Sequence, residues 1–329
     1  MNGQSVLVTG GAGMIGSNLV KCLVQAGARV KVADNLWRGK REYLETESTP
    51  VIDMERQFLE LDLSIPGALD PHLQDVEYVV HLADIVAGIN YVFDNQGFVF
   101  RQNLLIDSNV IESCRKHKPA GFLYAGTACS FPAEKQSGVD AAPLTEGDQF
   151  PANPESAYGW SKLMGEYQSF LMGKELDVPI SVLSFHNVYG PPCDFSESTS
   201  QVIPSLIRKA IDFPDHPFIV WGTGQQGRAF VHVDDIVNAI MAALTQGWGH
   251  GVIQIGPDTC TSIRSLAESI VDISGKDIEI QFDSTKPEGD RGRCADFSKA
   301  RRILGWSPKK PIRTGLAELY EWMEKQIHS

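Results

Sequence analysis

Apolar positions fall into short blocks along the first part of the chain. Residues 5–9 form an apolar run of strand length, and a glycine-rich turn follows it. Residues 15–24 then carry apolar side chains at helical spacing, and after Gly27 a second apolar run over 30–33 ends in Asp34. This order predicts a strand, a turn, a helix and a second strand.

The same alternation continues beyond residue 50. The segments 58–64, 77–84 and 121–127 are predicted as further strands, and a long helix is predicted over 97–117. Strands that alternate with helices predict an α/β fold with a Rossmann-type, doubly wound parallel sheet. Ligands of such sheets bind at the carboxyl ends of the strands, where "TACSFP" follows the run at 121–127.

The first turn has the glycine spacing of a dinucleotide site. It fits both G-x-G-x-x-G (Gly11, Gly13, Gly16) and G-x-x-G-x-x-G (Gly10, Gly13, Gly16). Glycines let the backbone approach a pyrophosphate, which then lies on the helix N-terminus. Asp34 can accept hydrogen bonds from an adenosine ribose and would repel a 2′-phosphate, so NAD is expected rather than NADP. The residues expected to bind NAD are Gly10, Gly13, Met14, Ile15, Gly16, Asp34, Asn35, Asp62, Leu63, Leu82 and Ala83, with Tyr158 and Lys162.

The alternation loosens after residue 183 into mixed loops and shorter elements. We expect an NAD-binding Rossmann domain over 1–183, with a returning segment near 231–262. A smaller, interdigitated α/β substrate domain is expected over 184–329.

The composition of the chain limits the kinds of partner that it is expected to bind. The net charge of −12 over 329 residues argues against binding to nucleic acid or an anionic membrane, because both favour a basic surface. No apolar stretch has the length to cross a bilayer, and the N-terminus runs straight into a strand without a signal peptide. Six scattered cysteines lack ligand or redox spacing, so neither a metal site nor disulfides are expected. A reduced, cytoplasmic location is therefore predicted.

A tyrosine and a lysine in "SAYGWSKL" have the spacing of a proton-relay pair. Tyr158 and Lys162 lie four residues apart, on one face of a predicted helix. A nearby ammonium and an oxidised nicotinamide would lower the pKa of the phenol, and Thr127 can supply a second hydrogen bond to a reacting hydroxyl. This set predicts oxidation of an alcohol with hydride transfer to NAD. For Cys129, two residues after Thr127, packing without chemistry and a role as proton carrier both stay open.

These motifs resemble the extended short-chain dehydrogenase/reductases that modify nucleotide sugars. The resemblance runs through TGGAGMIG, HLAD, YAGTAC, YGWSK, FHNVYGP, WGTGQQGRAFVHVDD and PEGDRGRCAD. It implies bound NAD, a transient ketone at C4 of the sugar and catalytic roles for Thr127, Tyr158 and Lys162. It also implies a homodimer formed through a four-helix contact.

Within this family the chain resembles the GDP-mannose 3,5-epimerases. There a cysteine in an A-C-x-x-P stretch removes a proton beside the ketone, and Cys129 matches it. A free thiol has a pKa of ~8.5, so nearby positive charge would help to ionise it. The subfamily's lysine, which reprotonates from the opposite face, is replaced here by Gln201. His186, Cys193 and water are the alternative donors.

Arginines in glycine-rich loops of so acidic a chain are expected to bind a diphosphate, since their planar forks match its oxygens. By resemblance, Arg228 and Arg293 are favoured over Arg291. The residues expected to bind the nucleotide-diphosphate sugar are Gly88, Asn103, Asn187, Arg228, Arg291 and Arg293.

The leading hypothesis is an NAD-dependent nucleotide-sugar epimerase, with GDP-hexoses and GDP-heptoses as candidate substrates and Cys129 as the base beside the ketone. A simple 4-epimerase, a 4-dehydrogenase that releases the keto sugar and a non-catalytic NAD-binding sensor are the alternatives.

Overall fold

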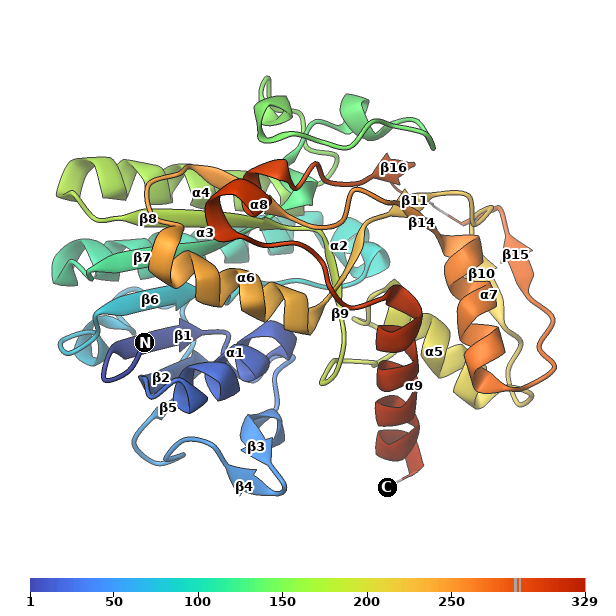
Figure 1. The fold of residues 1–329 in the computed structure, drawn as a ribbon, viewed down its shortest axis with the longest axis horizontal. Helices are drawn as coiled ribbons and strands as arrows, with labels where there is room; N and C mark the ends of the chain where they lie inside the picture. Colours follow the sequence, from blue (N-terminus) through green and yellow to red (C-terminus); the bar gives the residue numbers. More distant parts are fainter. Residues whose placement is uncertain (287–288, 290, 329) are drawn as a thin grey trace.

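A central sheet of seven parallel strands organises the molecule (Figure 1). The computed structural model describes residues 1–286, 289 and 291–328. The strand order is β13-β8-β7-β6-β1-β2-β5, so the direction of winding changes between β1 and β6. The strands are β1 (Ser5–Thr9), β2 (Arg29–Asp34), β5 (Phe58–Glu60), β6 (Tyr78–His81), β7 (Gly121–Thr127), β8 (Ile180–Phe185) and β13 (Val252–Ile255). The predicted α/β, Rossmann-type fold is confirmed.

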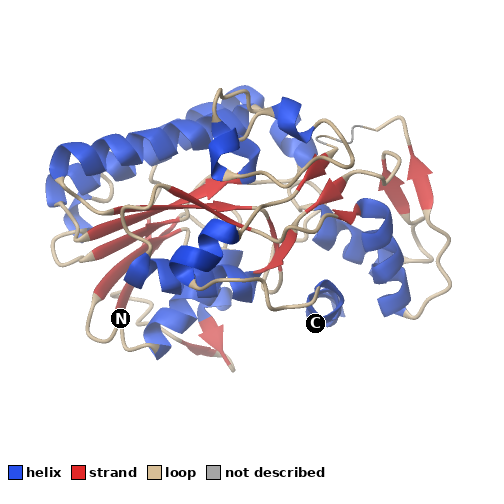
Figure 2. Ribbon diagram, turned by 45° about the horizontal axis from the view of Figure 1, so that its top comes forward, coloured by secondary structure: helices blue, strands red, loops and turns tan. Residues whose placement is uncertain are grey.

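Helices cover both faces of this sheet (Figure 2). Successive side chains of β1 point to opposite faces: Val6 and Val8 belong to one core and Leu7 to the other. The first core contains residues of α1 (Met14–Gln25), α6 (Val233–Gln246) and α8 (Ser298–Leu304). The second contains residues of α3 (Gln96–His117) and α4 (Ala157–Leu176). Because both faces are covered, the strands are nearly continuous apolar runs.

A smaller lobe has its own core and lies beyond the carboxyl ends of the strands (Figure 1). Its helices are α5 (Val202–Asp212), α7 (Ile263–Ser274) and α9 (Ile312–His328). A three-stranded sheet has the order β14 (Thr261–Ser262), β11 (Gly227–Arg228) and β16 (Gly292–Arg293), and β10 (Ile219–Trp221) pairs with β15 (Gln281–Asp283).

The two parts exchange segments. β9 (Asn187–Tyr189) pairs with β12 (Phe230–His232), after which α6 packs on the first core and β13 joins the large sheet beside β8. Asp235 of α6 is buried, and its carboxylate accepts hydrogen bonds from the backbone N–H groups of Lys309 and Lys310. The segment that follows α8 is thereby tied to α6. The domain boundary at 183/184 stays a prediction.

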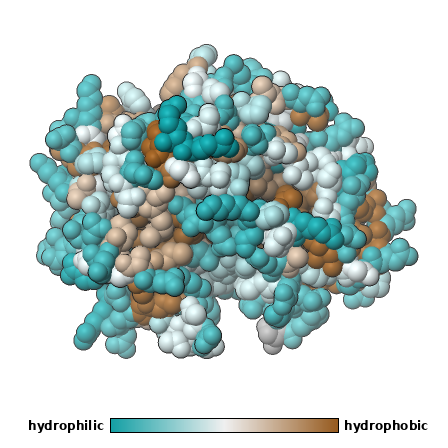
Figure 3. Space-filling model, viewed as in Figure 1, coloured by the Kyte–Doolittle hydropathy of each residue, from teal (hydrophilic) through white to brown (hydrophobic). Residues whose placement is uncertain are grey.

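Hydrophilic residues cover most of the face drawn in Figure 3, which also shows separate hydrophobic patches. In the described part of the chain, no helix combines the length and the apolarity needed to cross a membrane. The short elements are η1 (Arg41–Leu44), β3 (Glu45–Thr46), β4 (Thr49–Pro50), η2 (Asp70–His72), α2 (Ile89–Asp94), η3 (Ala128–Ser130), η4 (Ala133–Gln136) and η5 (Glu146–Gln149).

Candidate active site

A cavity of about 780 Å³ extends from the first glycine turn to the smaller lobe. It lies at the carboxyl ends of the parallel strands, as expected for a doubly wound sheet. All the residues expected to bind NAD line it, and so do the four expected catalytic residues. The structure therefore brings these two predicted groups together.

The glycine turn leaves no room for side chains. Gly10 has a φ of +67°, and a Cβ there would lie 2.9 Å from the backbone nitrogen of Ala83. A Cβ at Gly16 would lie 2.2 Å from the carbonyl oxygen of Gly10. Gly13 is the N-cap of α1, and no side chain of the described residues caps that helix end. Its first backbone N–H groups can therefore bind an anion.

Asp34 closes the turn from the end of β2. Its carboxylate accepts hydrogen bonds from the backbone N–H groups of Ala12, at 2.9 Å, and Leu36, at 2.8 Å. Burial raises the pKa of Asp34, and these two hydrogen bonds oppose that rise. The carboxylate is thus fixed beside the turn, as the ribose of a dinucleotide requires. The free helix end, the tight glycines and this carboxylate fit NAD.

Thr127, Cys129 and Tyr158 meet where β7 ends. Thr127 Oγ1 accepts a hydrogen bond from the backbone N–H of Cys129 at 3.2 Å, and the hydroxyls of Thr127 and Tyr158 share another. Ser156 caps α4 by accepting a hydrogen bond from Gly159 N at 3.2 Å. A Cβ at Gly159 would lie 2.1 Å from the carbonyl oxygen of Cys129, so this glycine lets α4 approach the cysteine.

Lys162 has a partner that the sequence did not indicate. Its ammonium forms a buried ion pair with the carboxylate of Asp84, and it also lies 4.2 Å from the centre of the Tyr124 ring. We expected the ammonium to lower the pKa of Tyr158. Instead burial raises the pKa of Tyr158 well above its ordinary value, and the charges of Cys129 and Asp84 raise it further.

A chain of buried polar groups supports this site from behind. Thr9 Oγ1 lies 2.6 Å from His81 Nδ1, and His81 Nε2 lies 3.0 Å from a carboxylate oxygen of Asp107. The hydroxyl of Tyr124 donates to the other oxygen of Asp107 at 2.7 Å. These residues come from β1, β6, α3 and β7, so no local sequence pattern could connect them.

Four of the six residues expected to bind substrate line the cavity: Gly88, Asn187, Arg228 and Arg293. Arg228 and Arg293 are opposite each other on the parallel strands β11 and β16, and are 7% and 8% exposed. Paired positions on neighbouring strands place both side chains on the same face of the small sheet, and planar guanidinium groups match phosphate oxygens. Cavity and charge together favour a diphosphate here.

The other two lie outside the lining. Asn103 is buried, and its side chain makes hydrogen bonds to both backbone groups of Ile85. It shapes the segment after β6 instead of facing the cavity. Arg291 is exposed just before β16, and its backbone N–H donates to Gln136 O.

Gln201 lines the cavity as the N-cap of α5. Lys209 also lines it, but eight residues further along the same helix, roughly 12 Å away at 1.5 Å per residue. Its ammonium donates to Ile219 O at 2.6 Å, and burial lowers its pKa. Lys209 therefore cannot take the role of the lysine that the GDP-mannose 3,5-epimerases have at the position of Gln201.

The other expected proton donors are not suited to deliver a proton near pH 7. Burial lowers the pKa of His186 to about 3, so its imidazole is neutral near pH 7, and its Nε2 lies 3.1 Å from Gln254 Oε1. Burial raises the pKa of Cys193 to about 12, and Cys193 is not among the residues that line the cavity. Water stays the remaining candidate of the three.

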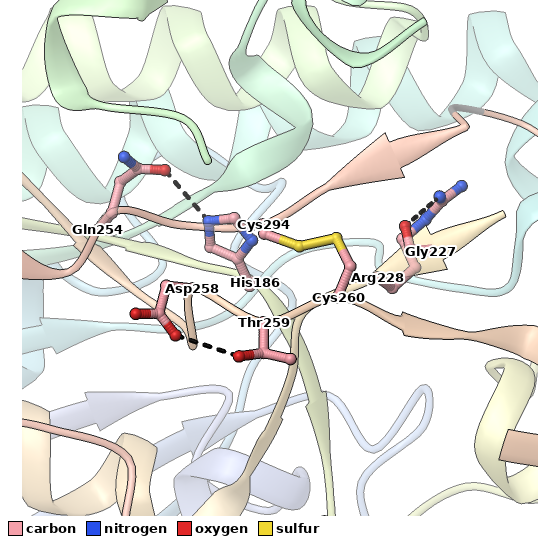
Figure 4. Close-up of a disulfide and its surroundings, with 8 residues drawn as sticks. All are labelled: His186, Gly227, Arg228, Gln254, Asp258, Thr259, Cys260 and Cys294. Atoms are coloured by element: carbon pink, nitrogen blue, oxygen red, sulfur yellow. Dashed lines mark hydrogen bonds between the residues drawn. A yellow bond between two sulfur atoms is a disulfide. The ribbon is translucent and has the colours of Figure 1, made fainter. Parts of the chain in front are cut away.

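The expectation of no disulfide was wrong. Cys260 and Cys294 form one, with their Cα atoms 5.6 Å apart (Figure 4). Cys260 precedes β14 and Cys294 follows Arg293 of β16, the two strands that flank β11. Thirty-four positions separate them in the chain, so spacing alone could not pair them. The predicted cytoplasmic location loses that support, while Cys22, Cys114, Cys129 and Cys193 are free.

One cluster outside the cavity has metal-ligand chemistry. His232, Asp234 and Glu318 bring ligand atoms within 4.8 Å of one another. The ammonium of Lys310 lies 2.9 Å from both carboxylate oxygens of Glu318 and 3.2 Å from Asp234. A cation from the chain itself thus pairs with both carboxylates, and the cluster joins α6 to α9.

Comparisons with known proteins agree with this geometry. A model of the NAD-dependent epimerase/dehydratase family matches residues 6–256. GDP-mannose 3,5-epimerase of Arabidopsis thaliana is 29% identical over 322 residues, which cover 98% of this chain and 82% of that protein. A UDP-glucose 4-epimerase from Thermotoga maritima, solved with UDP-glucose, is 27% identical with a TM-score of 0.86 and covers 98% of this chain and all of its own. A UDP-glucuronic acid 4-epimerase from Bacillus cereus, solved with UDP-glucuronic acid and NAD, is 27% identical with a TM-score of 0.83 at 98% and 100% coverage. The expected resemblance, the enzymatic character and the use of NAD are confirmed: the chain belongs to the NAD-dependent epimerase/dehydratase family.

Proposed function

We propose that this protein is a nucleotide-sugar epimerase that acts through a transient 4-keto sugar, with Cys129 as the base at the carbon next to the ketone. The observation that carries the proposal is the position of a free thiol beside the Thr127–Tyr158 hydroxyl pair, in the cavity that contains the glycine turn. GDP-linked hexoses and heptoses are the proposed substrates, because a GDP-mannose 3,5-epimerase is similar over nearly the whole chain.

Tyr158 takes the hydroxyl proton at C4 in this proposal. Thr127 lies beside the same group: its oxygen accepts from Cys129 N, and its hydrogen bond with the Tyr158 hydroxyl orients the phenol toward the sugar. NAD, when bound, supplies the acceptor for the hydrogen that leaves C4 and later returns it. Lys162 and the turn residues Gly10, Gly13 and Gly16 would hold NAD.

Cys129 acts next. A ketone at C4 makes the hydrogens at the neighbouring carbons acidic, and a thiolate can remove one of them. Cys129 is half-buried in η3, directly after the strand that ends in Thr127, so its thiol and the hydroxyl pair reach the same part of the cavity. Arg228 and Arg293 bind the diphosphate and thereby fix the sugar between the nucleotide and these groups.

A second candidate function is a simple 4-epimerase. The observation that favours it is Gln201, because glutamine cannot deliver the proton that epimerisation at C3 or C5 needs from the opposite face. Two of the similar solved structures are 4-epimerases. A 4-dehydrogenase, which releases the keto sugar, is equally compatible with glutamine at position 201, because it needs no proton delivered to C3 or C5.

A homodimer is also proposed. On the outer side of α3 and α4, the described residues Phe98, Leu105, Tyr167 and Leu171 are exposed. Exposed apolar side chains on two packed helices favour a second copy as their cover.

Heavy water separates these functions. The protein is incubated with GDP-mannose, other GDP-sugars and UDP-glucose in D₂O, and the recovered sugars are analysed by mass spectrometry and NMR. The proposed epimerase places deuterium on a ring carbon, and Cys129→Ser loses that deuterium while the absorbance of reduced cofactor at the first step persists. The Cys22→Ser variant, whose thiol lies on α1 outside the cavity, is the matched control.

Other outcomes would contradict the proposal. Epimerised product without carbon-bound deuterium indicates a 4-epimerase, and free keto sugar with accumulated reduced cofactor indicates a dehydrogenase. No turnover over the whole set of sugars would favour a non-catalytic sensor. Unchanged deuterium incorporation in Cys129→Ser would remove Cys129 from the mechanism.

A further inference from the structure

Asp84 is a buried charge at the active site for which the proposed chemistry gives no role. It follows β6 in the segment that lines the cavity, and its side chain is only 1% exposed. One carboxylate oxygen pairs with the ammonium of Lys162, whose side chain is 5% exposed. The other oxygen, Oδ1, is buried and has no hydrogen-bond partner among the described residues.

Stability does not explain this arrangement. Removing a carboxylate and an ammonium from water costs several kcal/mol per ion, and buried pairs are often no better than apolar residues of the same volume. A carboxylate kept only for structure would also have both oxygens satisfied, because an unpaired buried acceptor costs about 1–3 kcal/mol. The unpaired oxygen and its place in the cavity lining indicate a role toward the reacting groups.

We infer that Asp84 is a positioning residue, whose carboxylate fixes the ammonium of Lys162 and opposes the ionisation of Tyr158. The inference rests on the proposed role of Tyr158 as the group that takes the C4 hydroxyl proton. With Lys162 neutralised by Asp84, the phenol loses the positive charge that would otherwise stabilise its ionised form.

Charges on several elements face Tyr158. Cys129 of η3, Asp84 after β6 and Asp107 of α3 each raise the pKa of Tyr158, and burial raises it most. The hydrogen bond from Thr127 of β7 opposes them. Lys162 is the nearby cation on α4, and Asp84 is the carboxylate that pairs with it.

Asp84 thereby makes ionisation of Tyr158 depend on what occupies the cavity. Burial and the neighbouring carboxylate of Asp107 raise the pKa of Asp84 to about 8, so above that pH the cluster carries more negative than positive charge while His81 is neutral. Such a cluster resists one more negative charge on the phenol until a bound group contributes positive charge or donates a hydrogen bond to Oδ1. The site would then hold its reactive tyrosine protonated when empty.

The ultraviolet absorbance of tyrosinate tests this without a substrate. The full-length protein is titrated from pH 7 upward, and the same titration of a Tyr158→Phe partner is subtracted in each background. Tyr158 of the unchanged protein should not ionise below about pH 10, the ordinary value for tyrosine. In Asp84→Asn the Tyr158 midpoint should fall by about 1–3 units. Asp62→Asn, which removes a carboxylate elsewhere in the cavity lining, should leave it unchanged.

Equal Tyr158 midpoints in the unchanged protein and Asp84→Asn would overturn the inference, as would an equal fall in Asp62→Asn. Should Asp84→Asn fail to fold, Asp84→Ala replaces it, with Lys162 kept in place. Loss of the carboxylate must lower the Tyr158 midpoint there too, and an unchanged midpoint would overturn the inference.

This titration and the heavy-water experiment fail independently. A shifted midpoint without turnover would leave Asp84 as a positioning residue in a protein of another function. Deuterium incorporation without a shifted midpoint would keep the epimerase and dismiss Asp84.

Discussion

The two ends of the cavity are built by different means. The end expected to bind NAD, called the nucleotide end here, is formed by the backbone of a tight turn, a helix N-terminus and Asp34, all within one strand–helix–strand unit. At the other end, Arg228 and Arg293 project from a small sheet whose strands are far apart in the chain and whose flanks are joined by a disulfide. The first end is part of the main core, whereas the second depends on a separate small sheet for its shape.

Removal of the disulfide should cause the largest loss of stability and should leave NAD binding unchanged. A double Cys260→Ser/Cys294→Ser variant should lose about 2–4 kcal/mol of unfolding free energy, because the cross-link restricts a long loop in the unfolded chain. Denaturant unfolding measures the loss, with Cys22→Ser as the control. NAD affinity should not change, and an equal loss of NAD binding would show that the two ends are one unit.

Arg228 and Arg293 should control the affinity for the nucleotide part of the substrate, GDP or UDP, and leave the affinity for NAD unchanged. Arg228→Ala or Arg293→Ala should weaken binding of GDP and UDP by about 10- to 100-fold, since a hydrogen bond to a charged group is worth about 1.5–3 kcal/mol. Calorimetry measures both affinities. Arg291→Ala is the matched control because Arg291 is exposed and outside the lining. A loss as large in Arg291→Ala would refute the assignment of the clamp to the two strand arginines.

A larger side chain in the glycine turn should weaken the binding of NAD at the other end of the cavity. Gly16→Ala would place a Cβ 2.2 Å from Gly10 O, and relief of such a contact typically costs about 1–3 kcal/mol. We expect NAD affinity to fall by about 10-fold or more, with GDP affinity unchanged. Gly97→Ala is a control, since nothing lies within 4 Å of a Cβ at that position. Unaltered NAD binding in Gly16→Ala would contradict the close approach of the turn to the cofactor.

The smallest expected effect is on the choice of dinucleotide. Asp34→Asn removes the charge that repels a 2′-phosphate, so the preference for NAD over NADP should fall by about 10-fold, equivalent to about 1.4 kcal/mol. Fluorescence titration with both reduced dinucleotides measures the ratio. The ratio should not change in Asp62→Asn, and a fall of equal size there would mean that Asp34 does not set the preference.

The difference between the two ends also explains what could be predicted from sequence. The nucleotide end is local, so glycine spacing and apolar periodicity predicted the turn, its helix and Asp34 together. The predicted helix over 97–117 agrees with α3 to within one residue. Thr127, Tyr158 and Lys162 also follow local patterns and meet in the cavity.

The missed features are all contacts between distant segments. In the sequence, Asp84 is one of several residues at predicted strand ends, and only the folded chain brings it to Lys162. Cys260 and Cys294 become neighbours only because β14 and β16 flank β11. Arg291 and Arg293 stand two positions apart in one motif, yet only Arg293 lies on the strand that faces the cavity.

The place of β13 has a consequence for synthesis of the chain. Because β13 pairs with β8 and α6 packs beside α1, the large sheet lacks its last strand until Ile255 has left the ribosome. A fragment that ends just after β8, at residue 186, would expose β8 as an unpaired, apolar edge, which favours aggregation. The N-terminal half therefore depends on the C-terminal half to become a stable folded unit.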